Sequence, residues 1–339
     1  MAIGHSLPSS GRQFKNFFER LDDVEIDVFR SLDKVKSEPH EGSTFFRDCL
    51  IEWRELNTAE DFISFYEQMT PLVQTLPLIL LHKETIISEL VSRLQMDARL
   101  SLEPILTLIA ALSRDLLEDF IPFLPRIADS LVSLLESGTD KEPEIIEQIF
   151  TSWSSIMMYL QKYLVQKIKH ILKVTVKLRY YPKYHIQKCM AEAVSFLLRN
   201  APFEQLKEGV RKIMFEVVKK STDTRKEGVS KLLYFVMRGT SSRFHSRAER
   251  VLHFLMDDLI LCIGEQFNEG SETVLEVLKS ALESLCVDLD SKELNLMFNC
   301  LYREITDSVI NGGVERLSRL LLLLVFTVQV KNGQRVSGE

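Results

Sequence analysis

The sequence contains few of the residues that interrupt helices or cross-link chains. Among its 339 residues are 13 Gly, 10 Pro and 5 Cys. The cysteines are scattered, odd in number and never spaced as Cys-x-x-Cys. This pattern argues against a disulfide framework or a zinc site and is typical of a reducing compartment. With 45% hydrophobic and 27% charged residues, the composition predicts a folded protein with ample core.

Long hydrophobic runs are also lacking. The most apolar stretch, Leu320 to Val328, is nine residues long, whereas a membrane-spanning helix needs about 20. Residues 1–11 lack the apolar core of a secretory signal, and we expect them to be disordered. The sequence therefore predicts no contact with a membrane, and a protein of the cytosol or nucleus.

Sequence patterns of enzymes are missing as well. There is no His-Glu-x-x-His, no Gly-x-Ser-x-Gly and no glycine-rich phosphate-binding loop, which are the motifs that place metal ligands, nucleophiles and nucleotides. The seven histidines are dispersed, and His245 and His253 share a helix face without a Cys or carboxylate at ligand spacing. We therefore predict no catalytic residue, no cofactor or metal site and no small-molecule substrate. The protein is expected not to be an enzyme.

Helical periodicity, by contrast, runs through almost the whole chain. Leu102, Ile105, Leu106 and Ile109 follow the i, i+3, i+4, i+7 spacing of one helix face. The alternation typical of strands is almost absent. Equivalent helical stripes occur at 43–56, 58–75, 78–95, 120–135, 144–160, 163–178, 184–199, 203–220, 226–238, 244–262, 271–287, 290–309 and 313–330.

The breaks between these stripes are short and predict antiparallel helix pairs. Ser137-Gly138-Thr139 ends one helix, because Gly can take the left-handed conformation found there. Pro122 and Pro125 are acceptable only in a first helical turn, as in the second helix of a HEAT repeat. Helix pairs recur about every 40 residues, a period typical of HEAT and armadillo repeats. The predicted fold is all-α: a HEAT/armadillo-like α-solenoid of stacked antiparallel helix pairs, forming a single domain over 12–330.

The last predicted helix has an unusual composition for the end of a solenoid. Residues 317–330 are apolar on nearly all sides, whereas a terminal repeat needs a polar outer face. A polar tail, 331–339, follows directly. We therefore expect this chain to be a truncated part of a longer array.

Acidic residues are absent from one segment of this otherwise acidic chain. Between Gln161 and Met190 there is no Asp or Glu, but there are eight Lys and Arg. Residues 161–250, named here the basic band, hold 21 Lys and Arg against 7 Asp and Glu, a net charge of +14. The flanks are acidic, at −13 for 1–160 and −7 for 251–339. A basic band on an acidic chain can bind a polyanion at one place.

The spacing of the basic residues predicts where such contact occurs. If 163–178 is one helix, its lysines fall on one face, opposite the apolar residues. Tyr163, Tyr180, Tyr181 and Tyr184 lie among them and have the rings needed to stack on bases. The candidate RNA-contact residues are Lys162, Lys169, Lys173, Lys177, Arg179, Lys183 and Lys188.

Three interpretations of the basic band stay open. It can contact a polyanion such as RNA, it can meet an acidic protein surface, or it can be an ordinary solvated face. Ordinary solvated helix faces mix charges of both signs, because Glu–Lys pairs four residues apart stabilise helices. The one-sided bias over several consecutive helices therefore favours a binding role.

Short motifs in the first 135 residues occur in an order typical of one protein family. The most specific is Trp53-Arg54-Glu55-Leu56-Asn57. With these motifs the chain resembles the down-regulated-in-metastasis (DRIM) proteins, the large HEAT-repeat component of the small-subunit processome, well over about 14–135 and more weakly to about 200. The family-motif residues, interpreted as core and turn positions, are Phe18, Arg20, Leu21, Trp53, Arg54, Glu55, Leu56, Asn57, Asp119, Phe120 and Pro122.

The resemblance implies a much longer nucleolar α-solenoid, of which this chain would be the N-terminal part. Such a protein takes part in small-subunit maturation and 18S rRNA processing. Its implied partners are pre-rRNA or small nucleolar RNA and other small-subunit processome proteins, and its implied location is the nucleolus or nucleus. The resemblance implies no active-site residues.

Composition, periodicity and resemblance together predict a non-enzymatic scaffold in small ribosomal subunit biogenesis. We expect it to bind pre-rRNA backbone and assembly factors along a helical-repeat surface. The alternative is a protein-binding HEAT solenoid, such as a transport receptor or a phosphatase scaffold. The position of the basic residues discriminates between the two: exposed along one ridge for RNA, or buried in grooves between helices for protein partners.

Overall fold

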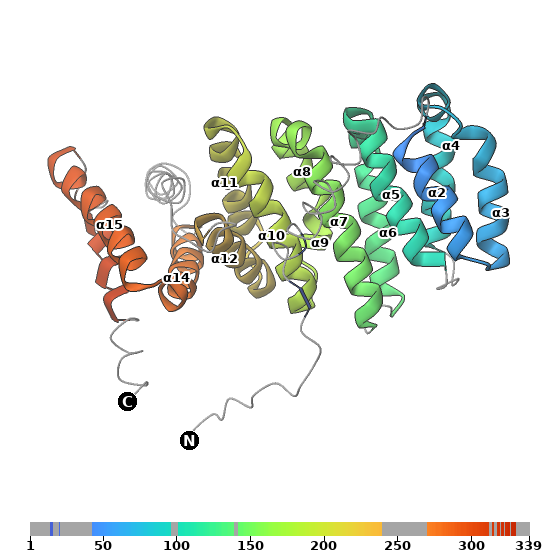
Figure 1. The fold of residues 1–339 in the computed structure, drawn as a ribbon. Helices are drawn as coiled ribbons and strands as arrows, with labels where there is room; N and C mark the ends of the chain where they lie inside the picture. Colours follow the sequence, from blue (N-terminus) through green and yellow to red (C-terminus); the bar gives the residue numbers. More distant parts are fainter. Residues whose placement is uncertain are drawn as a thin grey trace, which may run out of the picture. The chain divides into compact units, whose positions relative to one another are not determined.

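The computed structural model describes residues 14, 15, 20, 43–95, 101–138, 142–238 and 270–311, and several positions between 314 and 329. Apart from turns and short connections these residues are helical, and none of them forms a strand. They divide into two compact units, residues 1–160 and 161–339, and each is described by itself. The all-α prediction is confirmed (Figure 1). The helix predicted at 244–262 and the two terminal tails lie outside the described residues.

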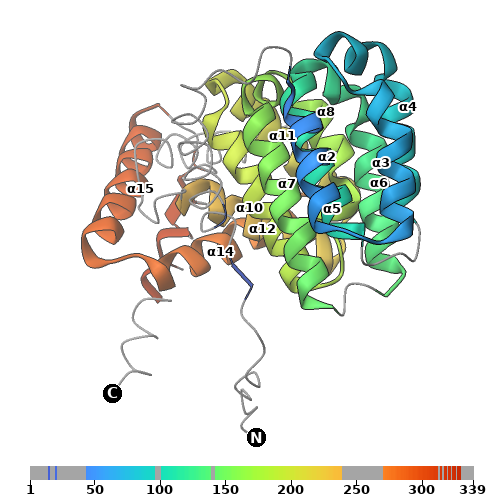
Figure 2. The same cartoon turned by 45° about the vertical axis from the view of Figure 1, so that its right-hand side comes forward.

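The first unit is built from helices that pack as antiparallel neighbours. Its elements are α2 (Phe45–Leu56), α3 (Glu60–Met69), η1 (Thr70–Leu72), α4 (Leu76–Leu94), α5 (Leu102–Leu116), η3 (Leu117–Phe123), α6 (Leu124–Glu136) and most of α7 (Pro143–Leu164). Helix α5 lies against both α2 and α4, and α4 also packs against α6 (Figure 2). This layering is that of a HEAT-like α-solenoid, because each helix buries its apolar stripe against a neighbouring pair.

Local chemistry sets the helix boundaries of this unit. Gly138 ends α6 with a φ of 99°, the left-handed conformation that was predicted for it. Pro125 lies in the first turn of α6, and Pro122 lies in the 3-10 helix η3 that leads into it. At the start of α2, the Asp115 carboxylate accepts hydrogen bonds from Phe45 N (3.0 Å) and Phe46 N (2.7 Å). A carboxylate at this place also interacts favourably with the helix dipole.

Phe14, Lys15 and Arg20, which precede α2 in the chain, contact α7. Arg20 is 2% exposed, and its Nη2 lies 2.7 Å from Glu147 Oε2. The same guanidinium lies 4.8 Å from the ring centroid of Phe150, and the Phe14 ring meets that ring edge-on at 6.0 Å. The family-motif residue Arg20 therefore makes a buried contact within the first unit.

The second unit, taken by itself, is also built from helices packed on neighbouring helices. Its elements are η5 (Val165–Lys167), α8 (Ile168–Val174), α9 (Val176–Arg179), α10 (Tyr184–Asn200), α11 (Phe203–Lys219), α12 (Asp223–Arg238), α14 (Gly270–Asp288) and α15 (Ser291–Asn311). Helix α12 packs between α10 and α14, and α11 packs on α8. A glycine permits the close approach of α11, because a Cβ at Gly209 would lie 2.4 Å from Leu198 Cδ2 and 2.9 Å from Ile168 Cγ2.

Candidate nucleic-acid interface

An interrupted helical segment carries the lysines of the basic band. Helix α7 continues to Leu164, η5 follows, and α8 and α9 meet at Thr175 (φ −85°, ψ 3°). The prediction of one helix over 163–178 is therefore wrong. Val174, Thr175 and Val176 are β-branched, so each loses side-chain freedom in a helix. The interruption at Thr175 falls within this run.

The interruption leaves the charged side chains outside and the apolar ones inside. Leu164, Ile168, Ile171, Leu172 and Leu178 are all buried. Five of the candidate lysines are exposed to solvent, and Lys188 is partly exposed. The five are Lys162, Lys169, Lys173, Lys177 and Lys183.

Acidic neighbours neutralise only part of this charge. Lys169 Nζ lies 2.9 Å from Glu208 Oε1 of α11, and the two side chains are 66% and 42% exposed. An exposed pair of this kind contributes about 0–1 kcal/mol to stability, so a phosphate can compete for the lysine. Lys188 Nζ lies 3.9 Å from Glu192 Oε1. Within the described residues, Lys162 and Lys173 form no ion pair.

Arg179 does not belong to this surface, which corrects its place among the candidate contacts. Its side chain is 0% exposed. Nη2 lies 2.6 Å from Glu216 Oε2 of α11, and Nη1 donates to the Leu172 carbonyl (2.9 Å) and Thr175 Oγ1 (3.0 Å). In an uninterrupted helix the Leu172 carbonyl would accept from the N–H four residues on. The charge of Arg179 is used inside the protein, to hold α8, α9 and α11 together.

The four tyrosines of the band have different environments. Tyr181 is buried, and Tyr163 and Tyr180 are partly exposed. The Tyr180 ring is enclosed by two guanidinium groups, with Arg179 at 4.7 Å and Arg225 at 5.0 Å from its centroid. Burial raises the pKa of Tyr180 above its usual value. Among the four, Tyr184 at the start of α10 has the most accessible ring, at 61%.

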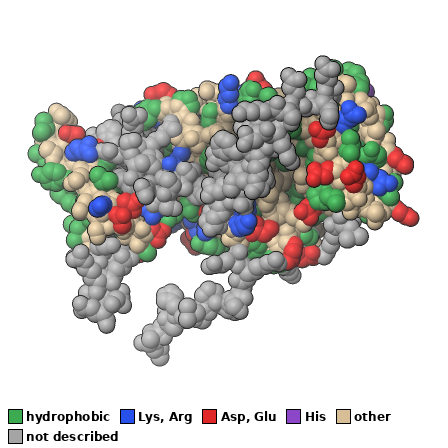
Figure 3. Space-filling model, viewed as in Figure 1, with side chains coloured by type: hydrophobic (Ala, Val, Ile, Leu, Met, Phe, Trp, Pro, Cys, Tyr) green, Lys and Arg blue, Asp and Glu red, His purple; other side chains and the backbone are tan. Residues whose placement is uncertain are grey.

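In the rest of the basic band, acidic residues lie among the basic ones, unlike in its first thirty residues. Lys226 pairs with Glu276, and Lys231 pairs with Glu227. On the face drawn in Figure 3, Lys and Arg side chains lie among Asp and Glu over the described surface. Arg243, Arg247 and Arg250 lie outside the described residues. The exposed basic residues of α11 are Arg211, Lys212 and Lys219, followed directly by Lys220.

The described family-motif residues of the first unit occupy core, turn and surface positions. Phe120 is fully buried, and Asp119 pairs with Lys83 of α4 at 2.8 Å. Asn57 is the C-cap of α2, and its Oδ1 accepts from Ala59 N at 3.0 Å. The surface positions are Glu55, Leu56 and Pro122, with Trp53 and Arg54 partly exposed. Phe18 and Leu21 lie outside the described residues.

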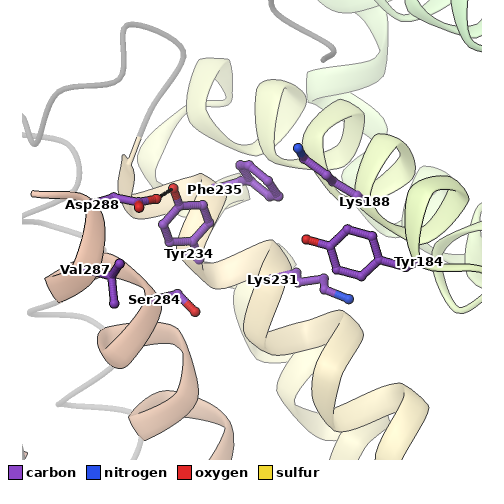
Figure 4. A pocket seen from close by; sticks show the side chains of 8 residues that line it. All are labelled: Tyr184, Lys188, Lys231, Tyr234, Phe235, Ser284, Val287 and Asp288. Atoms are coloured by element: carbon purple, nitrogen blue, oxygen red, sulfur yellow. Dashed lines mark hydrogen bonds between the residues drawn. The ribbon is translucent and has the colours of Figure 1, made fainter. Parts of the chain in front are cut away.

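One cavity in the second unit was not indicated by the sequence. It has a volume of about 400 Å³ and is lined from three helices (Figure 4). Local periodicity carries no signal for it, because its walls come from segments about 50 residues apart. The lining residues are Tyr184 and Lys188 of α10, Lys231, Tyr234 and Phe235 of α12, and Ser284, Val287 and Asp288 of α14.

Among the described residues, no group of three or more His, Cys, Asp and Glu is arranged to hold a metal ion. Within the same residues, no helix combines the length and hydropathy of a membrane span.

Comparison with known proteins gives the lineage of the chain. No model of a known protein family matches it. The U3 small nucleolar RNA-associated protein 20 of Saccharomyces cerevisiae is 33% identical over 202 residues, 59% of this chain. Its counterpart in Schizosaccharomyces pombe is 27% identical over 207 residues, 60% of this chain, and each match spans 8% of the relative's length. The predicted resemblance is thereby confirmed: over about 60% of its length, the chain is homologous to these two U3 small nucleolar RNA-associated proteins.

Proposed function

We propose that this chain is a non-enzymatic scaffold segment in small ribosomal subunit biogenesis, acting in the nucleolus as part of the small-subunit processome. Its relatives are named for association with U3 small nucleolar RNA, which supports a role beside RNA. We propose further that the second unit contacts the phosphate backbone of pre-rRNA. The observation that carries this step is the exposure of Lys162, Lys169, Lys173, Lys177 and Lys183 in a segment without a single acidic residue.

The proposed mechanism is electrostatic. Each lysine that meets a phosphate releases condensed counterions, so affinity falls steeply as salt rises. Lysines on flexible stems bind phosphate as point charges, and phosphate contacts carry no sequence information. The exposed lysines would therefore recognise the shape and phosphate backbone of a folded RNA. The acidic first unit, at −13, is the part we assign to protein assembly factors.

The test is a salt titration of the full chain with a structured segment of pre-18S rRNA. The informative variant is Lys173→Glu with Lys177→Glu, since both side chains are exposed. Lys169 is left unchanged, because a glutamate there would face Glu208. We expect the variant to bind at least about tenfold more weakly. The slope of log affinity against log salt should become shallower by about one to two, since each lost phosphate contact removes about 0.9 from it.

A charge-matched control separates the loss of local phosphate contacts at Lys173 and Lys177 from the effect of a changed net charge. Lys292→Glu with Arg303→Glu makes the same change in charge on exposed positions of α15, and we expect it to bind almost as well as the parent chain. Equal weakening by both double variants would reduce the effect to net charge. Absence of RNA binding at low salt, combined with tight binding of an acidic peptide, would favour the protein-binding solenoid.

A further inference from the structure

The cavity of the second unit combines aromatic rings with polar groups. Figure 4 shows the side chains of Tyr184 and Lys188 extending from α10 toward α12. Across the cavity, the Tyr234 and Phe235 rings meet edge to face with centroids 4.9 Å apart. A volume of about 400 Å³ lies within the range of roughly 300–1,000 Å³ typical of small-molecule sites.

Each of the three charged side chains that line this cavity already has a polar partner within the protein, and for Lys188 the partner is Glu192 at 3.9 Å. The Tyr234 hydroxyl donates to the Asp288 carboxylate. The Lys231 ammonium donates to Gln187 Oε1 at 2.7 Å and also to Glu227. A cavity whose charged groups already have polar partners favours an uncharged occupant over a phosphate, because burying an additional unpaired charge is costly.

One ring of the cavity is held in place yet accessible. Lys231 Nζ lies 4.1 Å from the ring centroid of Tyr184, a cation–π contact that restrains the ring. The Tyr184 side chain nevertheless stays 61% exposed. A flat heterocycle stacks well on such a ring, and stacking is tolerant of base identity because every base has a π-face.

Groups that suit a phosphate lie next to this ring. Lys183 is the exposed N-cap residue of α10, and an ammonium group has no acceptor for a capping hydrogen bond. The first N–H groups of a 17-residue helix then favour an anion. Tyr184 therefore lies between an aromatic cavity, whose charged groups have partners, and the positive start of a helix. This is the order in which a nucleotide presents its base and its phosphate.

We propose that the cavity binds one unpaired base of an RNA, with Tyr184 stacking on the base and the flanking phosphate at Lys183 and the start of α10. This inference rests on the proposed RNA contact and narrows it. The exposed lysines would contact the phosphate backbone of any folded RNA. The cavity, by contrast, would bind only an RNA with an accessible unpaired nucleotide. A base within a duplex has both faces stacked and does not reach the cavity.

The test compares two RNA probes with the full chain by fluorescence anisotropy. One is a stem with a loop of unpaired nucleotides, and the other is a fully paired duplex of the same stem. We expect Tyr184→Ala to weaken the loop probe about tenfold and to leave the duplex unchanged, while Tyr184→Phe keeps the affinity for both. Tyr302→Ala is the matched control, because Tyr302 is 67% exposed on α15 and does not line the cavity.

The outcomes separate this inference from the proposed function. If Tyr184→Ala changes neither probe, or weakens both equally, the base-binding cavity is overturned. If Lys173→Glu with Lys177→Glu still weakens both probes, the RNA-contact scaffold stands alone. Binding of an acidic peptide that is lost in Tyr184→Ala would assign the cavity to a protein partner and overturn the inference.

Discussion

The guanidinium of Arg179 is fully buried and lies 2.6 Å from Glu216, a residue 37 positions later in the chain. The Tyr180 hydroxyl donates to the same Glu216 oxygen at 3.3 Å. One buried ion pair therefore joins the interrupted segment α8–α9 to α11. Lys169, Lys173 and Lys177 are exposed on that same segment.

Removing one partner of this pair should destabilise the second unit strongly. We expect Arg179→Met to lower the free energy of unfolding by about 3 kcal/mol or more, because Glu216 then keeps a largely buried and uncompensated charge. The double variant Arg179→Met with Glu216→Met should recover a large part of this loss. Urea unfolding followed by circular dichroism measures both. A loss below about 1 kcal/mol for the single variant would mean that the pair behaves like an exposed one.

The carboxyl group of Asp115 should make the first unit sensitive to pH. Burial raises its pKa from 3.8 to about 6, against the opposing effect of the Phe46 and Phe45 N–H groups. Because the folded-state pKa lies above the unfolded one, Asp115 contributes most to stability below about pH 4. That contribution is lost as the pH rises through 6. At about 1.4 kcal/mol per pKa unit, the change is at most about 3 kcal/mol.

The variant Asp115→Asn removes this titration. The difference in unfolding free energy between variant and parent should shift in favour of the variant as the pH rises from about 4 to above 6. Urea unfolding at several pH values measures the difference, so that other titrating groups cancel. A difference that is flat over this range contradicts the prediction, whatever its sign.

Cys49 should be a poorly reactive thiol. Burial raises its pKa from 9.0 to about 12, and the negative charges of Glu52, Asp115 and Asp48 add to the effect. Since the thiolate is the reactive form, alkylation of the folded protein at mildly alkaline pH should be at least about a hundredfold slower than in concentrated urea. Peptide mass spectrometry after iodoacetamide treatment resolves this site from the other cysteines. Equal labelling of folded and unfolded protein would contradict it.

Gly209 should be intolerant of any side chain. A methyl group there would overlap Leu198 and Ile168 at the distances given above, and overpacking of this kind costs about 1–3 kcal/mol. The loss should exceed the gain of about 1 kcal/mol in helix propensity that alanine brings. Thermal unfolding of Gly209→Ala measures the net effect. Lys212→Ala, at an exposed position of the same helix, should change stability by less than about 0.5 kcal/mol.

Most of the secondary structure could be predicted because helices depend on local spacing. The helix predicted at 184–199 is observed as α10 (Tyr184–Asn200), and the one predicted at 203–220 is observed as α11 (Phe203–Lys219). The stripe at 163–178 failed, since its apolar spacing continued across a break. That break involves Thr175, which receives a hydrogen bond from the buried Arg179. Sequence patterns predict that a lysine or arginine in a basic segment is exposed. Only the tertiary structure shows whether it has a buried acidic partner.

The candidate site also has a part that the sequence predicted and a part that it did not. Amphipathic spacing alone placed Lys169 and Lys173 opposite Ile168 and Leu172, and the structure places the first two outside and the others in the core. The cavity beside Tyr184 had no counterpart in the sequence. Its walls meet only after α10, α12 and α14 have packed together.

The sequence by itself determined the all-α class, the helix-pair organisation, the lineage and the basic segment, since each depends on composition or on residues close together in the chain. Tertiary structure alone decided that Arg179 is a core residue and that Tyr184 stands at a cavity. Both outcomes depend on contacts between residues 37 or more positions apart, such as Arg179 with Glu216 and Lys231 with Gln187. Such contacts follow from how apolar helix faces pack, and packing partners leave no local pattern to read.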